Sequence, residues 1–140
     1  MADSMIRCNK IGRMNGIHLL GEWFGCPASA AMMSADVLRS LCLDAVTAAG
    51  LTPLGHTFHQ FSPQGVTGLV LLAESHVAVH TWPETSFATV DVYVCNVSTD
   101  NGDRAHALYD AIKRVLRPSE LREHVVHRGP DRPDAIRAVA

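Results

Sequence analysis

Four short stretches of apolar and β-branched residues follow one another in the middle of this 140-residue chain, and they constrain its fold more than any other feature. They span residues 54–61, 66–73, 77–82 and 89–95. The second stretch is almost wholly apolar, as a central strand should be. In the last, Val90, Val92 and Val94 alternate with Asp91 and Tyr93, which is the period of a strand with one buried face. The pattern therefore predicts a sheet over this region.

Two helical patterns flank these strands. Residues 34–49 carry apolar side chains at helical spacing, with Ser34 or Asp36 as the N-terminal cap. Residues 105–116 repeat that spacing, and Pro118 stops the second helix. Each helix has one apolar face that must be buried against another element.

A first strand over residues 17–24 and a short last strand at Val125 and Val126 complete the order strand, helix, several strands, helix, strand. The economical arrangement is an α+β fold, a two-layer α/β sandwich with helices on one face of a mostly antiparallel sheet. We expect an irregular N-terminal leader over residues 1–15, a single domain over 16–128 and a C-terminal tail over 129–140.

Composition argues against several classes of protein. Apolar residues make up 47% of the chain and charged residues 19%, which suits one packed domain. The net charge is −2 with no basic block, so nucleic acid is not an expected partner. No apolar run approaches a membrane span, and the first residues lack a signal-peptide core. We therefore expect a cytoplasmic protein that does not enter a membrane.

Four cysteines and eight histidines raise the question of a metal site. No two cysteines form a C-x-x-C pair, and no H-E-x-x-H motif is present. His56 and His59 would point to opposite faces of a strand, whereas His76 and His80 would lie about 13 Å apart on one face. The sequence predicts no bound metal, and it predicts free thiols rather than disulfides.

Ser75 stands in an expected tight turn between two apolar strands. A serine hydrolase would need a G-x-S-x-G elbow, but Ala73 and Val77 occupy the two glycine positions. Taken singly, Ser75 is an ordinary turn residue, His80 a hydrogen-bonded core histidine and Cys95 a buried thiol.

Taken together, three segments carry a specific pattern. They are residues 58–68, residues 73–84 with the string E-S-H-x-x-x-H-T-W-P-E, and residues 88–95 ending at Cys95. In order and spacing they closely resemble the small prokaryotic pyruvoyl-dependent S-adenosylmethionine decarboxylase proenzymes. The likeness runs from about Gly16 to the early hundreds, and more weakly to about Gly129.

The resemblance implies a self-cleaving chain. Ser75 would attack the carbonyl of Glu74, His80 would remove the Ser75 α-proton, and Thr67 would assist. The chain would split between residues 74 and 75, and Ser75 would become a covalent pyruvoyl cofactor. In turnover that group would form a Schiff base with the substrate amine, and Cys95 would reprotonate the α-carbon after carbon dioxide leaves.

The resemblance also implies a substrate and a partner. Phe61 and Trp82 would offer flat surfaces to the adenine or sulfonium of S-adenosylmethionine, and Glu84 would accept hydrogen bonds from its ribose. The product would supply aminopropyl groups for spermidine synthesis, and the enzyme would be a homodimer of cleaved protomers. Pyridoxal phosphate is the other electron sink for such chemistry, but the only lysines, Lys10 and Lys113, stand in the leader and on a helix.

The chain departs from the family pattern at several places, among them a leader over residues 1–15 that is longer than typical. Thr67 stands where the family usually has serine, Ile17 where it has arginine, and Asn96 where it has glycine. These departures bear on the substrate more than on self-processing. Two alternatives therefore stay open: a pyruvoyl-dependent arginine or ornithine decarboxylase on the same scaffold, and an unprocessed regulatory homologue without catalysis.

Overall fold

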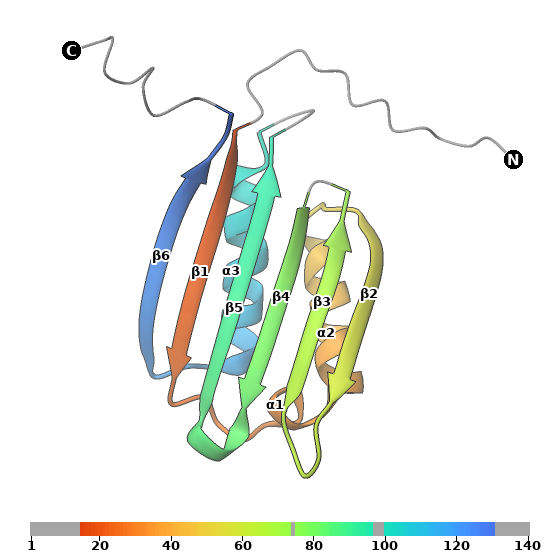
Figure 1. Cartoon of the computed structure of the whole chain (residues 1–140), viewed down its shortest axis with the longest axis vertical. Coiled ribbons are helices and arrows are strands. Elements are labelled where there is room, and N and C mark those ends of the chain that lie inside the picture. The colour runs from red at the N-terminus through yellow and green to blue at the C-terminus, as the bar shows by residue number, and fades with distance from the viewer. Residues whose placement is uncertain (1–14, 74, 97–99, 131–140) are drawn as a thin grey trace, which may run out of the picture.

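The alternating valines and the two amphipathic helices fold as their patterns predict. The computed structural model describes residues 15–73, 75–96 and 100–130 and arranges them as a six-stranded sheet with helices on one face (Figure 1). The elements in chain order are β1 Gly16–Phe24, α1 Ala30–Met33, α2 Ala35–Ala48, β2 Pro53–Gln60, β3 Val66–Leu72, β4 Ser75–Trp82, the 3-10 turn η1 Pro83–Thr85, β5 Phe87–Cys95, α3 Gly102–Leu116 and β6 Glu120–Arg128.

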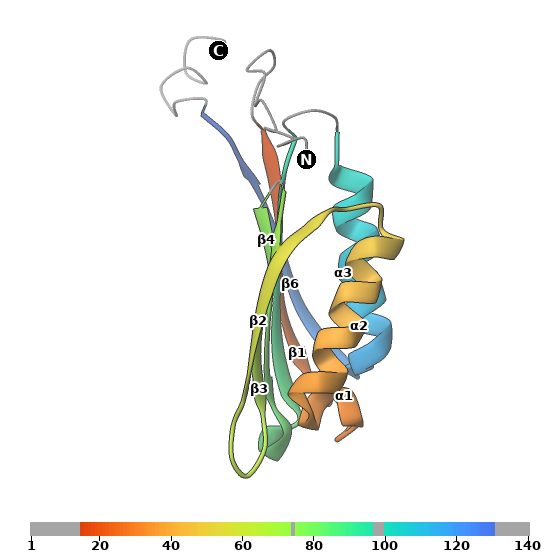
Figure 2. The same cartoon turned by 90° about the vertical axis from the view of Figure 1, so that its right-hand side faces the viewer.

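The strands lie in the order β2-β3-β4-β5-β1-β6, and every neighbouring pair is antiparallel. Figure 2 shows the helices gathered against one side of this sheet. The predicted α+β sandwich is confirmed. The predicted leader and tail fall almost entirely outside the described residues, so their boundaries stay predictions.

The last strand is longer than the sequence indicates. Beyond Val125 and Val126, β6 pairs with the whole of β1, from Gly16 opposite Arg128 to Phe24 opposite Glu120. All nine of its residues are exposed, so no buried periodicity marks the strand in the sequence. Backbone pairing to a neighbour, not burial, defines this edge strand.

Helix α2 begins where its cap predicts. The side chain of Ser34 accepts a hydrogen bond from the backbone N–H of Val37, which satisfies one of the free donors of the first turn. The short helix α1 is not signalled by any periodic pattern. The Thr81 hydroxyl ties it to the sheet, donating to the Met32 carbonyl at 2.8 Å and accepting from Val66 N–H at 2.9 Å.

The core lies between the helices and the sheet. Side chains exposed by 2% or less include Leu38, Cys42 and Val46 of α2, Leu108 and Ile112 of α3, Val77 and Val79 of β4, and Val90, Val92 and Val94 of β5. The other sheet face, here called the open face, carries Thr67, His80, Tyr93 and Cys95 from the alternate positions of β3, β4 and β5. No helix covers this face in the described part of the chain (Figure 2).

Among the described residues, no helix is both long and apolar enough to cross a membrane.

Candidate active site

Antiparallel pairing brings Ser75 to Cys95. Ser75 is the first residue of β4 and lies opposite Val94 of β5, so the neighbouring residue Cys95 is within reach. The Ser75 Oγ and the Cys95 Sγ are 3.1 Å apart. The β4–β5 pairing therefore brings the Ser75 hydroxyl and the Cys95 thiol, twenty positions apart in the chain, into direct hydrogen-bond contact.

The backbone at Ser75 is unusual. Leu72 pairs with Ser75 across the β3–β4 hairpin, so two residues make the connection. Ser75 has φ of 118°, a region that side-chain-bearing residues avoid and that costs about 1–3 kcal/mol. The strained position lies at the residue that the sequence singles out for cleavage.

A cluster of rings and charges surrounds Cys95. The Cys95 thiol donates to the Tyr93 hydroxyl at 3.2 Å. The Arg128 guanidinium of β6 lies 4.3 Å from the centroid of the Tyr93 ring. The rings of His18 and His76 lie 5.5 and 5.8 Å from the same ring. Strands β1, β4, β5 and β6 therefore all contribute to the surroundings of the thiol.

His18 is held in its neutral form. Burial lowers its pKa below 6.5, and Arg128 and His76 lower the pKa further, whereas Asp91 opposes the shift. The His18 Nε2 is buried without a hydrogen bond and stands 3.8 Å from the Asp91 carboxylate, which is too long for one. His18 and Asp91 form an ion pair only when His18 is protonated, and burial disfavours the protonated form.

Thr67 and His80 form a second polar pair. They lie opposite each other in the β3–β4 ladder, and the Thr67 Oγ1 is 3.1 Å from the His80 Nδ1. This contact fixes the orientation of the imidazole on the open face.

A cavity of about 490 Å³ adjoins this second pair. Its lining includes Thr67 and all three predicted substrate-binding residues, Phe61, Trp82 and Glu84. The volume is in the range of small-molecule sites. Gln60 fixes the loop that carries Phe61, since its amide donates to the carbonyls of Met33, Phe61 and Gly65 and accepts from Ala35 N–H.

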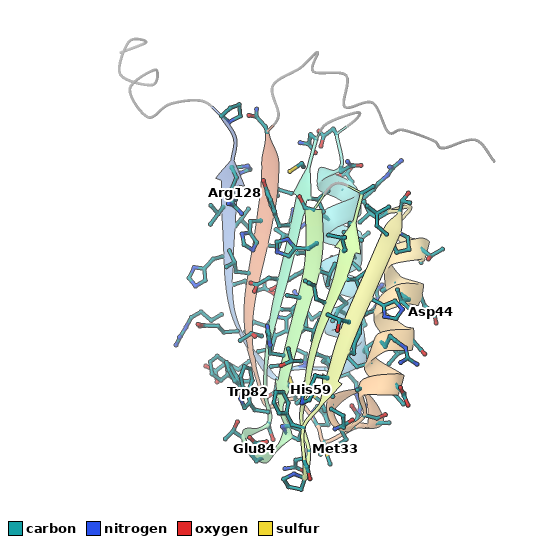
Figure 3. The ribbon with its side chains drawn as sticks, turned by 45° about the vertical axis from the view of Figure 1, so that its right-hand side comes forward. Met33, Asp44, His59, Trp82, Glu84 and Arg128 are labelled. Carbon is teal, nitrogen blue, oxygen red and sulfur yellow. The ribbon has the colours of Figure 1, made fainter. Side chains whose placement is uncertain are left out.

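The two polar pairs do not meet within one chain. His80 follows Ser75 by five residues along β4, a separation of roughly 17 Å on a strand. Figure 3 shows Arg128 at one end of the sheet, and Trp82 and Glu84 at the other. We call the Ser75–Cys95–Tyr93 group the thiol half-site, and the Thr67–His80 pair with its cavity the imidazole half-site. Glu74 lies outside the described residues.

Several neighbours of the site escape sequence reasoning. Tyr93 shares a face with Cys95 two residues away, which the period of β5 could have indicated. Arg128 reaches the site only through the β6 pairing, and Gln60 through contacts with a loop and with α1, for which the sequence offers no signal. Among the described residues, no three His, Cys, Asp or Glu side chains cluster as metal ligands.

These features define a class of protein. It has an antiparallel sheet with helices on one face, a strained serine (Ser75) at a hairpin, a thiol (Cys95) beside that serine and an imidazole (His80) on the same sheet. The model of the S-adenosylmethionine decarboxylase family matches residues 17–129. An S-adenosylmethionine decarboxylase proenzyme from Persephonella marina is 40% identical over 114 residues, covering 81% of this chain and 82% of that protein. One from Archaeoglobus fulgidus is 36% identical, covering 81% and 97%.

A solved structure agrees with these matches. The crystal structure of the adenosylmethionine decarboxylase from Aquifex aeolicus superposes with a TM-score of 0.77 at 36% identity, covering 87% of this chain and 97% of that one. The chain belongs to the S-adenosylmethionine decarboxylase family. The predicted family and the predicted class of enzyme are confirmed.

Proposed function

We propose that this chain is a self-processing decarboxylase that converts S-adenosylmethionine to its decarboxylated form and carbon dioxide, with a pyruvoyl cofactor made from Ser75. The single observation that carries the proposal is the 3.1 Å contact between the Ser75 hydroxyl and the Cys95 thiol at a strained hairpin. The names of relatives that match most of the chain support the substrate.

Self-processing uses the chain's own groups. The Ser75 Oγ attacks the carbonyl of Glu74, and the peptide bond between residues 74 and 75 becomes an ester. Loss of the Ser75 α-proton to His80 then expels the carboxyl group of Glu74. Hydrolysis of the resulting N-terminal residue releases ammonia and leaves the pyruvoyl group. The φ of 118° at Ser75 favours the first step, because breaking the strained peptide bond in that step releases backbone strain.

The residues around Ser75 suit such a cofactor. The pyruvoyl group supplies an electron sink for the charge left when carbon dioxide departs. Cys95 then delivers a proton to the α-carbon of the substrate, as the 3.1 Å approach of its Sγ to Ser75 allows. Each turnover consumes one proton, which the thiolate recovers from solvent.

The active enzyme is a homodimer that joins unlike half-sites. Within one chain, His80 is roughly 17 Å from Ser75 and cannot remove its proton. A second copy packed against the open face would bring its imidazole half-site to the thiol half-site of the first. Such packing would also cover Leu69, Leu71 and Val126, which are 38, 50 and 44% exposed on that face.

The imidazole half-site favours an adenosine over a short basic amino acid. Phe61 and Trp82 are 47 and 39% exposed and offer apolar ring faces to a purine or a sulfonium cation. Glu84 lines the same cavity, where its carboxylate can accept hydrogen bonds from ribose hydroxyls. Arginine and ornithine would leave this aromatic surface unused. We expect the enzyme to act in the cytoplasm, in polyamine synthesis.

Intact mass and substrate turnover together test this function. The purified protein should consist of residues 1–74 and a fragment that begins at residue 75, and it should release carbon dioxide from S-adenosylmethionine far faster than from arginine or ornithine. Ser75→Ala should stay one chain. Ser86→Ala is the matched control, because Ser86 also has a positive φ but lies after η1. Cleavage of the Ser75→Ala chain at the same bond would overturn the proposal.

A further inference from the structure

The thiol of Cys95 has two hydroxyl neighbours in the described part of the chain, and processing removes one of them. Before cleavage, Sγ lies 3.1 Å from the Ser75 Oγ and 3.2 Å from the Tyr93 Oη. Conversion of Ser75 to a pyruvoyl group eliminates the serine hydroxyl. In the mature enzyme Tyr93 is then the described side chain that remains hydrogen-bonded to the sulfur.

We propose that Tyr93 is a positioning residue for proton delivery by Cys95, an inference that rests on the proposed function. With the thiol protonated, the Tyr93 oxygen accepts the S–H and holds the sulfur in place. When the proton passes from Sγ to the substrate α-carbon, the S–H bond breaks and a C–H bond forms. The Tyr93 O–H then rotates to donate to the thiolate, and the sulfur recovers a proton from water.

The surroundings of Tyr93 suit this exchange. The hydrogen bond with Cys95, together with burial, raises the pKa of the phenol above 10, so the hydroxyl keeps the proton that it donates to the sulfur. Arg128 stacks on the ring at 4.3 Å from β6, and its positive charge favours negative charge on the nearby oxygen and sulfur. His18 from β1 and His76 from β4 pack against the same ring and limit its rotation.

Three properties of the ring and its partners therefore act together. The ring is held from three strands, its hydroxyl contacts the sulfur, and a cation lies over its face. The other ionisable side chains beside this cluster are Asp91, which faces His18, and Cys95 itself. A role in packing alone would need the ring but not the hydroxyl, and this difference makes the role testable.

The test is Tyr93→Phe, which keeps the ring and removes only the hydroxyl. Alkylation of Cys95 by iodoacetamide, followed across pH by peptide mass spectrometry, reports how readily the thiolate forms. Loss of the hydrogen bond that Tyr93 donates to the charged sulfur should slow the alkylation of Cys95 about tenfold around neutral pH. Carbon dioxide release per cleaved chain should fall about tenfold or more.

Tyr109→Phe is the matched control. It removes the other tyrosine hydroxyl of the chain, which bonds Trp23 and Glu123 on the helix side of the sheet. This variant should leave the alkylation of Cys95 unchanged. An alkylation profile of Tyr93→Phe identical to that of the unaltered protein would overturn the inference. Because alkylation needs no turnover, slower alkylation in a protein that fails to decarboxylate would contradict the proposed function and not this inference.

Discussion

Two side chains near Tyr93 and Cys95 show how burial and hydrogen bonding set the chemistry of single residues. Ser75 and His18 both lie on strands near Tyr93 and Cys95. The Ser75 hydroxyl has a hydrogen-bond partner, whereas the His18 Nε2 has none in the described part of the chain. The Ser75 hydroxyl is hydrogen-bonded to a thiol at a strained backbone. The His18 imidazole is half-buried, and its buried Nε2 has no hydrogen bond in the described part of the chain. The first residue is the one for which we propose a reaction, whereas the second is a source of pH dependence.

The pKa of His18 predicts a loss of stability in weak acid. Its pKa is lowered in the folded protein, mainly by burial, so the unfolded chain binds a proton that the folded chain does not. The free energy of unfolding therefore falls as the pH decreases through 6.5 toward the lower folded value. His18→Gln removes this contribution, and the variant should lose less stability over the same window.

Urea denaturation between about pH 7.5 and 5.5 measures this difference, with 6.5 as the reference pKa of histidine. The two proteins should be compared at one fixed concentration. An equal loss of stability in both proteins would mean that His18 does not titrate as its burial indicates.

At the scale of elements, helix α2 is held by its inner face. Leu38 is fully buried, whereas the adjacent Val37 is 36% exposed. Leu38→Ala should lower the free energy of unfolding by about 2–5 kcal/mol, because it leaves a cavity against the sheet. Val37→Ala, the matched control, should change it by under about 0.5 kcal/mol.

Both substitutions are best measured in a Ser75→Ala background, so that an uncut chain unfolds. The measurement is again urea denaturation at one protein concentration. Similar losses for the two variants would contradict the assignment of Leu38 to the core.

Elements with a buried face could be predicted from the sequence, and elements without one could not. The alternating valines of β5 and the capped apolar face of α2 make those elements predictable, since the apolar residues of the pattern are the ones that are buried. Strand β6 has nine exposed residues and forms because β1 offers a free edge. Its pairing partner β1 is distant in the sequence; the paired residues Glu22 and Arg122, for example, are 100 positions apart.

The same distinction applies to the site. The motif around Ser75 predicts Ser75, His80 and Cys95 as site residues, but it does not give the distances between them in the fold. Only strand geometry shows that His80 is too far along β4 to serve its own Ser75. Arg128 joins the site through a strand that the sequence barely indicates, so its part could not be predicted.

At the scale of the whole molecule, the helices cover one face of the sheet (Figure 2). In the described part of the chain no helix covers the other face, which carries Thr67, His80, Tyr93 and Cys95 of the two half-sites. The half-sites lie toward opposite ends of that face (Figure 3). If two copies pack open face to open face in opposite directions, each thiol half-site meets the imidazole half-site of its partner. The bare face and the separated half-sites then have one common explanation.

Co-expression of two inactive chains tests this account most directly. Ser75→Ala lacks the nucleophile, and His80→Ala lacks the proton acceptor, so neither chain should be cleaved efficiently alone. In a mixed dimer, the first chain supplies His80 to the Ser75 of the second. With a tag on the Ser75→Ala chain to capture mixed dimers, intact mass should show the His80→Ala chain cut between residues 74 and 75. A captured His80→Ala chain that stays whole, or one that is cut equally well on its own, would contradict the account.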